Sequence, residues 1–310
     1  MTGSVGLTVC LATHNRAAAL PRVLAAFAAL TPPPGGWAMI VVDNGSTDAT
    51  AAVLQDHADR LPLTILSCPT PGKNRALNMA LPLLRGSLAV FTDDDVLPDA
   101  DWLVQLHAAA EAHPEASLFG GTVLPDWPRP PPPWLSEQAV EFSVLYSQQR
   151  RPSGPCGFAD IFGPNMAVRP AVFADGTRFA EHVGPDGSKP LYAMGSETEL
   201  LRRLEAAGHR GWFEASARVG HIIRPEHMEE GWILDRAYRY GVGEGRHYAG
   251  APSARQVLRR VVYRVAARGM AVLPPSARRL RIRYRDRWLA GVADGVAAAP
   301  PAGSATAPTG

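Results

Sequence analysis

The first hundred residues of this chain alternate between short, uninterrupted apolar runs and stretches with helical spacing. The apolar runs, which predict strands, are at 7–11, 39–42, 63–66 and 88–91, and the helical stretches are at 17–30, 49–57 and 75–84. Apolar runs without polar alternation are typical of strands buried on both faces of a sheet. Strands that alternate with helices at these lengths indicate an α/β fold with a doubly wound, mostly parallel sheet flanked by helices.

The length and composition are those of a globular protein of the cytoplasm. A chain of 310 residues can bury a large core. Its three cysteines, Cys10, Cys68 and Cys156, are too widely spaced for a disulfide framework or a zinc knuckle, and they suit a reducing compartment. The apolar runs fall short of the ~18 residues of a membrane span. The apolar segment at 5–12 is too short for a signal peptide and has no basic flank.

Polar clusters follow three of the predicted strands. They are residues 13–16 (Thr-His-Asn-Arg), 43–46 (Asp-Asn-Gly-Ser) and 93–95 (Asp-Asp-Asp). Ligands of doubly wound sheets bind at the carboxyl ends of the strands, which meet at one edge. The sequence therefore predicts a binding site built from these three clusters.

The aspartate triplet is the most chemically specific of these clusters. If strand geometry continues past residue 91, Asp93 and Asp95 point to one side and Asp94 to the other. Two carboxylates on one face suit Mg²⁺ or Mn²⁺, with water and substrate phosphates as the other ligands. The alternative interpretation is an acidic turn that caps a helix beginning near Asp99 or Asp101.

Four segments, in order along the chain, resemble the family 2 glycosyltransferases, which have the GT-A fold. They are residues 11–16 (Leu-Ala-Thr-His-Asn-Arg), 41–48 (Val-Val-Asp-Asn-Gly-Ser-Thr-Asp), 72–78 (Gly-Lys-Asn-Arg-Ala-Leu-Asn) and 91–95 (Phe-Thr-Asp-Asp-Asp). The resemblance covers about Leu7 to His221 and extends to about Gly241. It implies an inverting transfer of a sugar from a nucleotide sugar to an acceptor hydroxyl, with a divalent metal ion.

The resemblance also implies roles for individual residues of the donor site. The implied nucleotide-binding residues are Thr13, Asn15, Arg16, Asp43, Arg75, Asp93 and Asp94. Among them, Asp43 would accept a hydrogen bond from a pyrimidine base, and Arg75 would lie near the ribose or diphosphate. Asp95 and His221 would hold Mn²⁺ or Mg²⁺, and an imidazole ligand favours Mn²⁺.

The segment 195–204 resembles the family segment that carries the general base, which would be Glu197. The family usually has Glu-Asp where this chain has Ser196-Glu197, so the carboxylate reaches about one methylene further and Glu199 remains an alternative base. Both glutamates would also favour a helix N-terminus without any catalytic role. On the acceptor side, Asn165 would either orient a sugar hydroxyl or shape a turn.

The C-terminal part differs in composition from the rest. The predicted divisions are a GT-A domain at 1–245, with a nucleotide-binding half at 1–122 and an acceptor-side half at 123–245, an arginine-rich helical extension at 246–290, and a disordered tail at 291–310. Residues 255–287 hold eleven arginines and one acid, Asp286, whereas the whole chain has a net charge of +2.

Two interpretations of the arginine-rich extension remain open. A basic helix with apolar residues at helical spacing can lie on an anionic membrane surface, where a lipid-linked acceptor would be found. The alternative is a solvated helix that packs on the catalytic domain. Nucleic acid is not expected as a partner, because no nucleic-acid-binding module accompanies the charge.

Other functions are weighed against glycosyl transfer. A catalytically degenerate sugar-nucleotide binding module is favoured only by the altered Ser196-Glu197 pair. A sugar-phosphate nucleotidylyltransferase would have an early glycine-rich loop, and residues 11–22 contain no glycine. Dinucleotide dehydrogenases are excluded by the missing Gly-X-Gly-X-X-Gly turn. UDP is the expected nucleotide, with dTDP and GDP as alternatives, and the resemblance implies a saccharide or lipid-linked acceptor in cell-surface polysaccharide or glycolipid assembly.

Overall fold

The computed structural model describes residues 6–186, 192, 194–247 and 254–298, and the chain divides into two compact units. The first unit comprises Met1–Trp127, Tyr146–Pro190 and Gly195–Ile223, and the second comprises Pro128–Leu145, Leu191–Met194 and Arg224–Gly310. Within the described residues, none of the helices is both long enough and apolar enough to cross a membrane.

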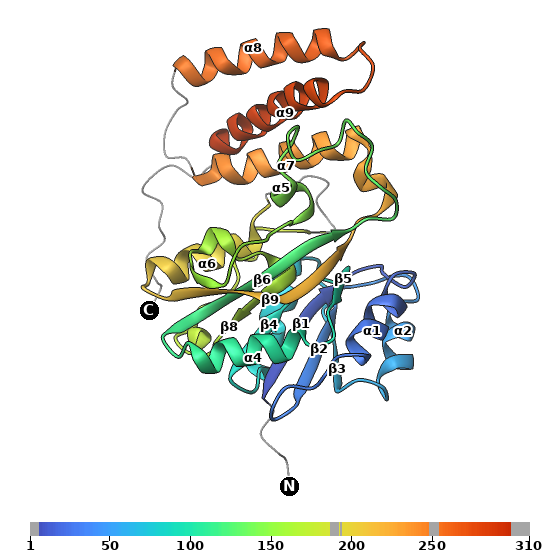
Figure 1. Cartoon of the computed structure of the whole chain (residues 1–310), viewed down its shortest axis with the longest axis vertical. Coiled ribbons are helices and arrows are strands. Elements are labelled where there is room, and N and C mark those ends of the chain that lie inside the picture. Colours follow the sequence, from blue (N-terminus) through green and yellow to red (C-terminus); the bar gives the residue numbers. More distant parts are fainter. Residues whose placement is uncertain (1–5, 187–191, 193, 248–253, 299–310) are drawn as a thin grey trace. The chain divides into compact units, whose positions relative to one another are not determined.

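The first unit is built on one mixed sheet (Figure 1). Its strands are β1 (Leu7–Thr13), β2 (Trp37–Asp43), β3 (Leu63–Ser67), β4 (Leu88–Phe91), β5 (Val96–Pro98), β6 (Ala116–Asp126), β7 (Gly154–Cys156), β8 (Met166–Val168) and β9 (Arg210–Ile222). They lie in the order β3-β2-β1-β4-β8-β6-β9-β5, and β7 also pairs with β9. β1 to β4 are parallel, β8 is antiparallel to both of its neighbours, and β6 and β9 are parallel. The predicted fold class is confirmed.

Helices cover both faces of this sheet, as expected for a doubly wound fold. On one face lie α1 (Leu20–Ala28), α2 (Thr50–His57) and α4 (Trp102–Ala112), and on the other lie α3 (Lys73–Ala80) and α6 (Ser196–Ala206). Because successive strand residues point to opposite faces, Val9 and Leu11 of β1 enter the core beneath α1, whereas Cys10 enters the core beneath α3. β1 is therefore buried from both sides, which explains its uninterrupted apolar sequence.

The second unit is helical in its C-terminal part. Its helices include α7 (Glu230–His247), α8 (Ala254–Met270) and α9 (Ala277–Ala297), while the short α5 (Phe142–Tyr146) comes earlier in the chain. α7 belongs to this unit, although the sequence analysis places residues up to 245 in the catalytic domain. α9 also continues past Gly291, where composition predicts that a disordered tail begins, and residues 299–310 lie outside the described part.

Close packing at glycines of α7 and α9 explains why α9 continues past Gly291. Gly241 of α7 and Gly291 of α9 lie where the two helices touch backbone to backbone. A Cβ atom added at Gly291 would be 2.1 Å from the carbonyl oxygen of Tyr238, and one added at Gly241 would be 2.2 Å from that of Trp288. Gly245 and Gly295 make the same kind of contact one turn further along. Small residues that suggest a tail in the sequence are thus packing residues in the fold.

This packing predicts that Gly291→Ala destabilises the second unit. The added methyl group must push α7 and α9 apart, and overpacking of this kind costs about 1–3 kcal/mol of unfolding free energy. Gly269→Ala on α8 is the matched control, because nothing lies within 4 Å of a Cβ atom there. Urea unfolding followed by circular dichroism should show a loss for Gly291→Ala only, and equal stability of the two variants would contradict the prediction.

Candidate active site

The polar clusters that follow β1 and β4 are in direct contact, as the strand order requires. The Thr13 hydroxyl donates a hydrogen bond to Asp94 Oδ2 at 2.7 Å. Arg16 Nε lies 3.1 Å from Asp94 Oδ1, and its Nη2 lies 3.4 Å from Asp95 Oδ2. β2 joins the same edge, because Thr13 is the register partner of Asp43 at the end of β2.

Asn15 and Asp43 shape the loops at this edge. Asn15 adopts a left-handed conformation with φ of 52°, and its Oδ1 accepts a hydrogen bond from the Thr47 amide at 2.8 Å. Asp43 Oδ1 accepts a hydrogen bond from the Ser46 amide at 3.0 Å. Asp43 Oδ2 has no donor among the described residues, so this oxygen is free to accept a hydrogen bond from a ligand.

The aspartate triplet does not continue the strand. β4 ends at Phe91 and the backbone turns at residues 94–95, so the predicted alternation of the three side chains is wrong. The chain has to turn here because β5 runs antiparallel to β9, with Val96 opposite His221. Asp93 consequently faces Lys73 and Asp95 faces His221, while Thr13 contacts Asp94 and Arg16 contacts both Asp94 and Asp95.

Lys73, at the start of α3, connects the triplet to the predicted base. Its ammonium lies 2.5 Å from Asp93 Oδ1 and 2.5 Å from Glu197 Oε1 at the start of α6. Lys73 lies in the segment 72–78, whose resemblance to the family implies no role for it. The only clue to Lys73 in the sequence is its position inside a segment that resembles the family. Its two partners lie 20 and 124 residues away along the chain.

The charges of this group depend on one another. Burial lowers the pKa of Lys73, but the carboxylates of Asp93 and Glu197 outweigh burial and raise it. Burial raises the pKa of Glu197, but the charge and hydrogen bond of Lys73, together with the Ser196 hydroxyl and a backbone amide, lower it below its ordinary value. For Asp93, burial outweighs Lys73 and raises the pKa. Lys73 is therefore charged and Glu197 ionised at neutral pH.

The pKa values of the other two carboxylates of the triplet, Asp94 and Asp95, are shifted in opposite directions. Burial raises the pKa of Asp94 to about 6, although the nearby Arg16 guanidinium opposes this shift. Burial also acts to raise the pKa of Asp95, but His221 outweighs it and the pKa falls below its ordinary value. For His221, burial lowers the pKa while Asp95 raises it, and the net shift is upward.

Asp95 and His221 form a pair of potential metal ligands. His221 Nδ1 lies 2.7 Å from the carbonyl oxygen of Tyr146, and since a carbonyl only accepts, Nδ1 must donate. The other ring nitrogen, Nε2, then faces Asp95 Oδ1 at 3.5 Å. In the part of the chain that the structure describes, no three acidic, histidine or cysteine side chains converge on a metal position. The pair fits an ion that takes its remaining ligands from phosphates and water.

Glu197, and not Glu199, belongs to the acidic cluster. The Ser196 hydroxyl donates to Glu197 Oε2 at 2.6 Å, and Lys73 holds the other oxygen. Gly163 leaves space for this carboxylate, because a Cβ atom there would be 2.8 Å from Glu197 Cδ. Glu199 lies further along α6 and pairs with Arg203 at 2.7 Å.

Asn165 is part of the core. It is fully buried, its Oδ1 accepts a hydrogen bond from Trp102 Nε1 at 2.9 Å, and its Nδ2 donates to the carbonyl oxygens of Thr122 and Ala217. Contact with a sugar hydroxyl would require these bonds to break. Of the two predicted roles, the geometry therefore fits the one in which Asn165 shapes the backbone.

Arg75 lies apart from the acidic cluster. Its Nε donates to Glu181 Oε2 at 2.8 Å, and both side chains are more than one-third exposed. No described contact joins Arg75 to the triplet or to Glu197. The cation that reaches the predicted diphosphate region is Lys73, two positions earlier in the same helix.

The chain belongs to glycosyl transferase family 2. The sequence pattern of that family matches residues 8–177, more than half of the chain. One relative is the glucosyl-dolichyl phosphate glucuronosyltransferase of Haloferax volcanii, which is 25% identical over 243 residues, or 76% of this chain and 75% of that protein. The family resemblance in the sequence is confirmed, and the protein is a glycosyltransferase by family.

Solved structures share the fold. The mannosyltransferase PcManGT of Pyrobaculum calidifontis, in complex with GDP-Man and Mn²⁺, matches with a TM-score of 0.61 and 18% identity over 93% of this chain and 86% of that one. S. aureus TarS 1–349 in complex with UDP-GlcNAc matches with a TM-score of 0.54 and 17% identity over 94% of this chain and 81% of that one. At these identities the likeness establishes the fold alone.

The Lys73 bridge predicts an asymmetric effect on stability. Lys73→Met leaves Asp93 and Glu197 without their shared cation and should cost about 3 kcal/mol of unfolding free energy. Adding Glu197→Gln to that variant should recover part of the loss, because one of the unpaired charges is removed. Arg75→Met, which breaks an exposed ion pair, should cost less than about 1 kcal/mol. Denaturant unfolding measures all three, and similar small losses for Lys73→Met and Arg75→Met would contradict the bridge.

Proposed function

We propose that this protein is an inverting, metal-dependent glycosyltransferase that moves a sugar from a nucleotide sugar to an acceptor hydroxyl. The observation that carries the proposal is the cluster at the carboxyl ends of β1 and β4, where Lys73 bridges Asp93 and Glu197 and Arg16 bridges Asp94 and Asp95. Membership of glycosyl transferase family 2 supports it. The cluster supplies both charge for a donor diphosphate and a carboxylate base for an acceptor.

The proposed donor site lies along the ends of β1 and β2. The free Oδ2 of Asp43 would accept a hydrogen bond from the base, while Asn15 holds the two loops in register through Thr47. Thr13 and Arg16 position Asp94, which in turn borders the metal pair. UDP is the proposed nucleotide, with dTDP and GDP as alternatives, since fold relatives have been solved with UDP-GlcNAc and with GDP-Man.

Asp95 and His221 would hold Mn²⁺ or Mg²⁺. When bound, such an ion offsets the negative charge that accumulates on a leaving nucleoside diphosphate. The Tyr146 carbonyl keeps a proton of His221 on Nδ1, so Nε2 is the ring nitrogen that would bind an ion held together with Asp95. Arg16 also contacts Asp95 and limits the number of directions in which this carboxylate can turn.

Glu197 is the proposed general base. It would take the proton from the acceptor hydroxyl while the hydroxyl oxygen bonds to the anomeric carbon and the bond to the diphosphate oxygen breaks, which inverts the configuration. Lys73 keeps Glu197 ionised but also weakens it as a base. A donor diphosphate would compete for Lys73, and loss of that partner would raise the pKa of Glu197 toward a value suited to proton transfer.

The proposed acceptor is a saccharide or a lipid-linked sugar used in cell-surface polysaccharide or glycolipid assembly. One relative is named for action on glucosyl-dolichyl phosphate, a sugar carried on a lipid phosphate. We place the protein in the cytoplasm, bound peripherally to the inner face of the plasma membrane. The arginine-rich helices α8 and α9 support this location.

Nucleotide binding tests the donor site. Calorimetric titration of UDP should show binding that is strong with Mn²⁺ and weak with EDTA, and Asp95→Asn should lower the affinity with Mn²⁺ to the EDTA level. Asp99→Asn is the control, because Asp99 is half-exposed and lies opposite Arg218, outside the cluster. GDP and dTDP are titrated if UDP does not bind. A folded protein that binds none of the three in the presence of Mn²⁺ would overturn the proposal.

Transfer activity tests the base. With a donor that binds, Glu197→Gln should lower the rate of transfer by about 100-fold or more, while the nucleotide binds no more weakly because its diphosphate then competes with Asp93 alone for Lys73. Glu199→Gln, which loses only its pair with Arg203, should retain a near-normal rate. If Glu199→Gln is the damaging change, the base assignment is wrong. Nucleotide-sugar binding without any transfer by the wild type would favour a degenerate binding module.

A further inference from the structure

The outward side of α8 is apolar. Leu258, Val261, Val262 and Val265 recur at the spacing of one helical face, and each is more than half exposed. Beyond the end of the helix, Val272 is 87% exposed and Leu273 is also exposed. We refer to these six residues as the α8 ridge.

The α8 ridge is not the packing side of the helix. α8 packs on α9, and the buried residue on that side is Ala267, which is 7% exposed. At 100° per residue, Ala267 lies opposite the middle of the ridge. Single exposed valines are ordinary on a protein surface, but a continuous apolar band along a helix marks a surface that binds something.

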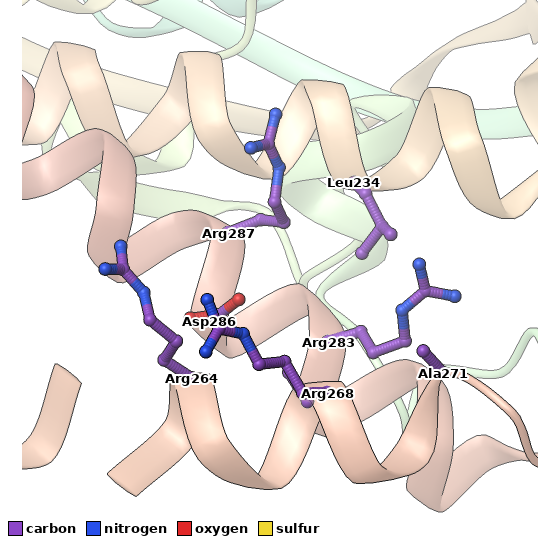
Figure 2. A pocket seen from close by; sticks show the side chains of 8 residues that line it. Leu234, Arg264, Arg268, Ala271, Arg283, Asp286 and Arg287 are labelled. Carbon is purple, nitrogen blue, oxygen red and sulfur yellow. The ribbon is translucent and has the colours of Figure 1, made fainter. Parts of the chain in front are cut away.

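A pocket of about 320 Å³ lies beside the ridge, between α7, α8 and α9 (Figure 2). Its lining residues are Leu234, Arg264, Ala267, Arg268, Ala271, Arg283, Asp286 and Arg287. Four guanidinium groups thus face the pocket with a single carboxylate among them. The pocket lies wholly within the second unit.

Two of these arginines carry unbalanced charge. Arg283 pairs with Glu230 at 2.7 Å, and Arg287 pairs with Asp235 at 3.3 Å. Arg264 and Arg268, both exposed on α8, have no ion-pair partner among the described residues. Asp286 offsets one positive charge at most, so the pocket has an excess of positive charge that favours an anion.

The pocket and the ridge adjoin each other on α8. Arg264 and Arg268 follow Val261 by three and seven positions, a spacing that places all three along one side of the helix. A guanidinium group can hold a phosphate through two parallel hydrogen bonds. The second unit therefore presents phosphate-binding groups at the border of an apolar band.

We propose that the α8 ridge and this arginine pocket form a docking surface for a bilayer that contains anionic phospholipids. The ridge side chains enter the apolar boundary of the bilayer, and a lipid phosphate binds Arg264 and Arg268 in the pocket. The inference deepens the membrane location given under the proposed function, on which it rests. It does not depend on glycosyl transfer, because lipid binding is measured without donor or metal.

The combination of charge and apolar surface favours a bilayer over nucleic acid. A nucleic-acid surface would bring aromatic side chains free to stack on bases, whereas the α8 ridge consists of valine and leucine, and Tyr263 of α8 already lies against the Arg259 guanidinium at 5.9 Å. In a bilayer, headgroup phosphates lie next to an apolar interior. The arginines of the pocket lie next to the apolar α8 ridge in the same order. Co-sedimentation with vesicles distinguishes lipid binding from the binding of free phosphate by the same arginines.

Co-sedimentation of the full chain with vesicles tests the proposal. The wild type should bind vesicles of phosphatidylcholine mixed with phosphatidylglycerol and should not bind vesicles of phosphatidylcholine alone. The pocket variant Arg264→Gln/Arg268→Gln and the ridge variant Val261→Ser/Val265→Ser should each bind the anionic vesicles about tenfold more weakly or worse. Arg60→Gln/Arg85→Gln removes the same charge from exposed sites of the first unit and should bind normally.

The folding of each variant and its binding of competing ligands are measured in the same experiment series. Each variant should keep the wild-type circular dichroism spectrum and the wild-type affinity for UDP, so that a lost donor site and a lost membrane surface can be told apart. Equal vesicle binding by the pocket variant and the wild type would overturn the proposal. So would inorganic phosphate bound at Arg264 and Arg268 without vesicle binding, or DNA bound through these residues when vesicles are not.

Discussion

The shared ammonium of Lys73 is the interaction on which the rest of the site depends. The pairing of β1 with β4 brings Thr13 and Arg16 beside the consecutive residues Asp93, Asp94 and Asp95, and the start of α6 adds Glu197. Carboxylates this close repel one another unless cations lie between them. Lys73 joins Asp93 to Glu197, and Arg16 joins Asp94 to Asp95, so the acids stay together in the absence of any ligand. In the proposed reaction, a donor diphosphate would replace one of these carboxylates as a partner of Lys73.

Local sequence signals predict the first half of the fold well. β1, β2 and β4 are apolar runs buried on both faces, β3 is a partly exposed apolar strand at the sheet edge, and the helices between them have apolar spacing, so these elements can be recognised without distant residues. The turn at Asp94 and Asp95 escapes such reasoning, because it is set by the pairing of β5 with β9 more than a hundred residues later. β5, β7 and β8 are three-residue strands, too short to show a period.

The site residues also differ in whether their contacts can be predicted from local sequence. Thr13 and Arg16 can be predicted to meet the aspartate triplet because they lie at the end of a neighbouring strand, and the structure brings Thr13 to Asp94 and Arg16 to Asp94 and Asp95. The contacts of Lys73 and of the Tyr146 carbonyl are long-range and have no local signature. Asn165 is a polar residue in a loop-like sequence, so both of its predicted roles stay open until the fold shows it buried and fully hydrogen-bonded. At the C-terminal end, glycine content suggests disorder only until α7 is known to pack against α9.

Anomalous diffraction from crystals grown with Mn²⁺ and UDP would test the central claim most directly, because the manganese position is seen independently of any assigned role. The account predicts one manganese peak within bonding distance of Asp95 and of His221 Nε2, with the diphosphate toward Lys73 and the uracil beside Asp43. A manganese ion and nucleotide bound away from the ends of β1 and β4, with Lys73 still bridging Asp93 and Glu197, would contradict the account.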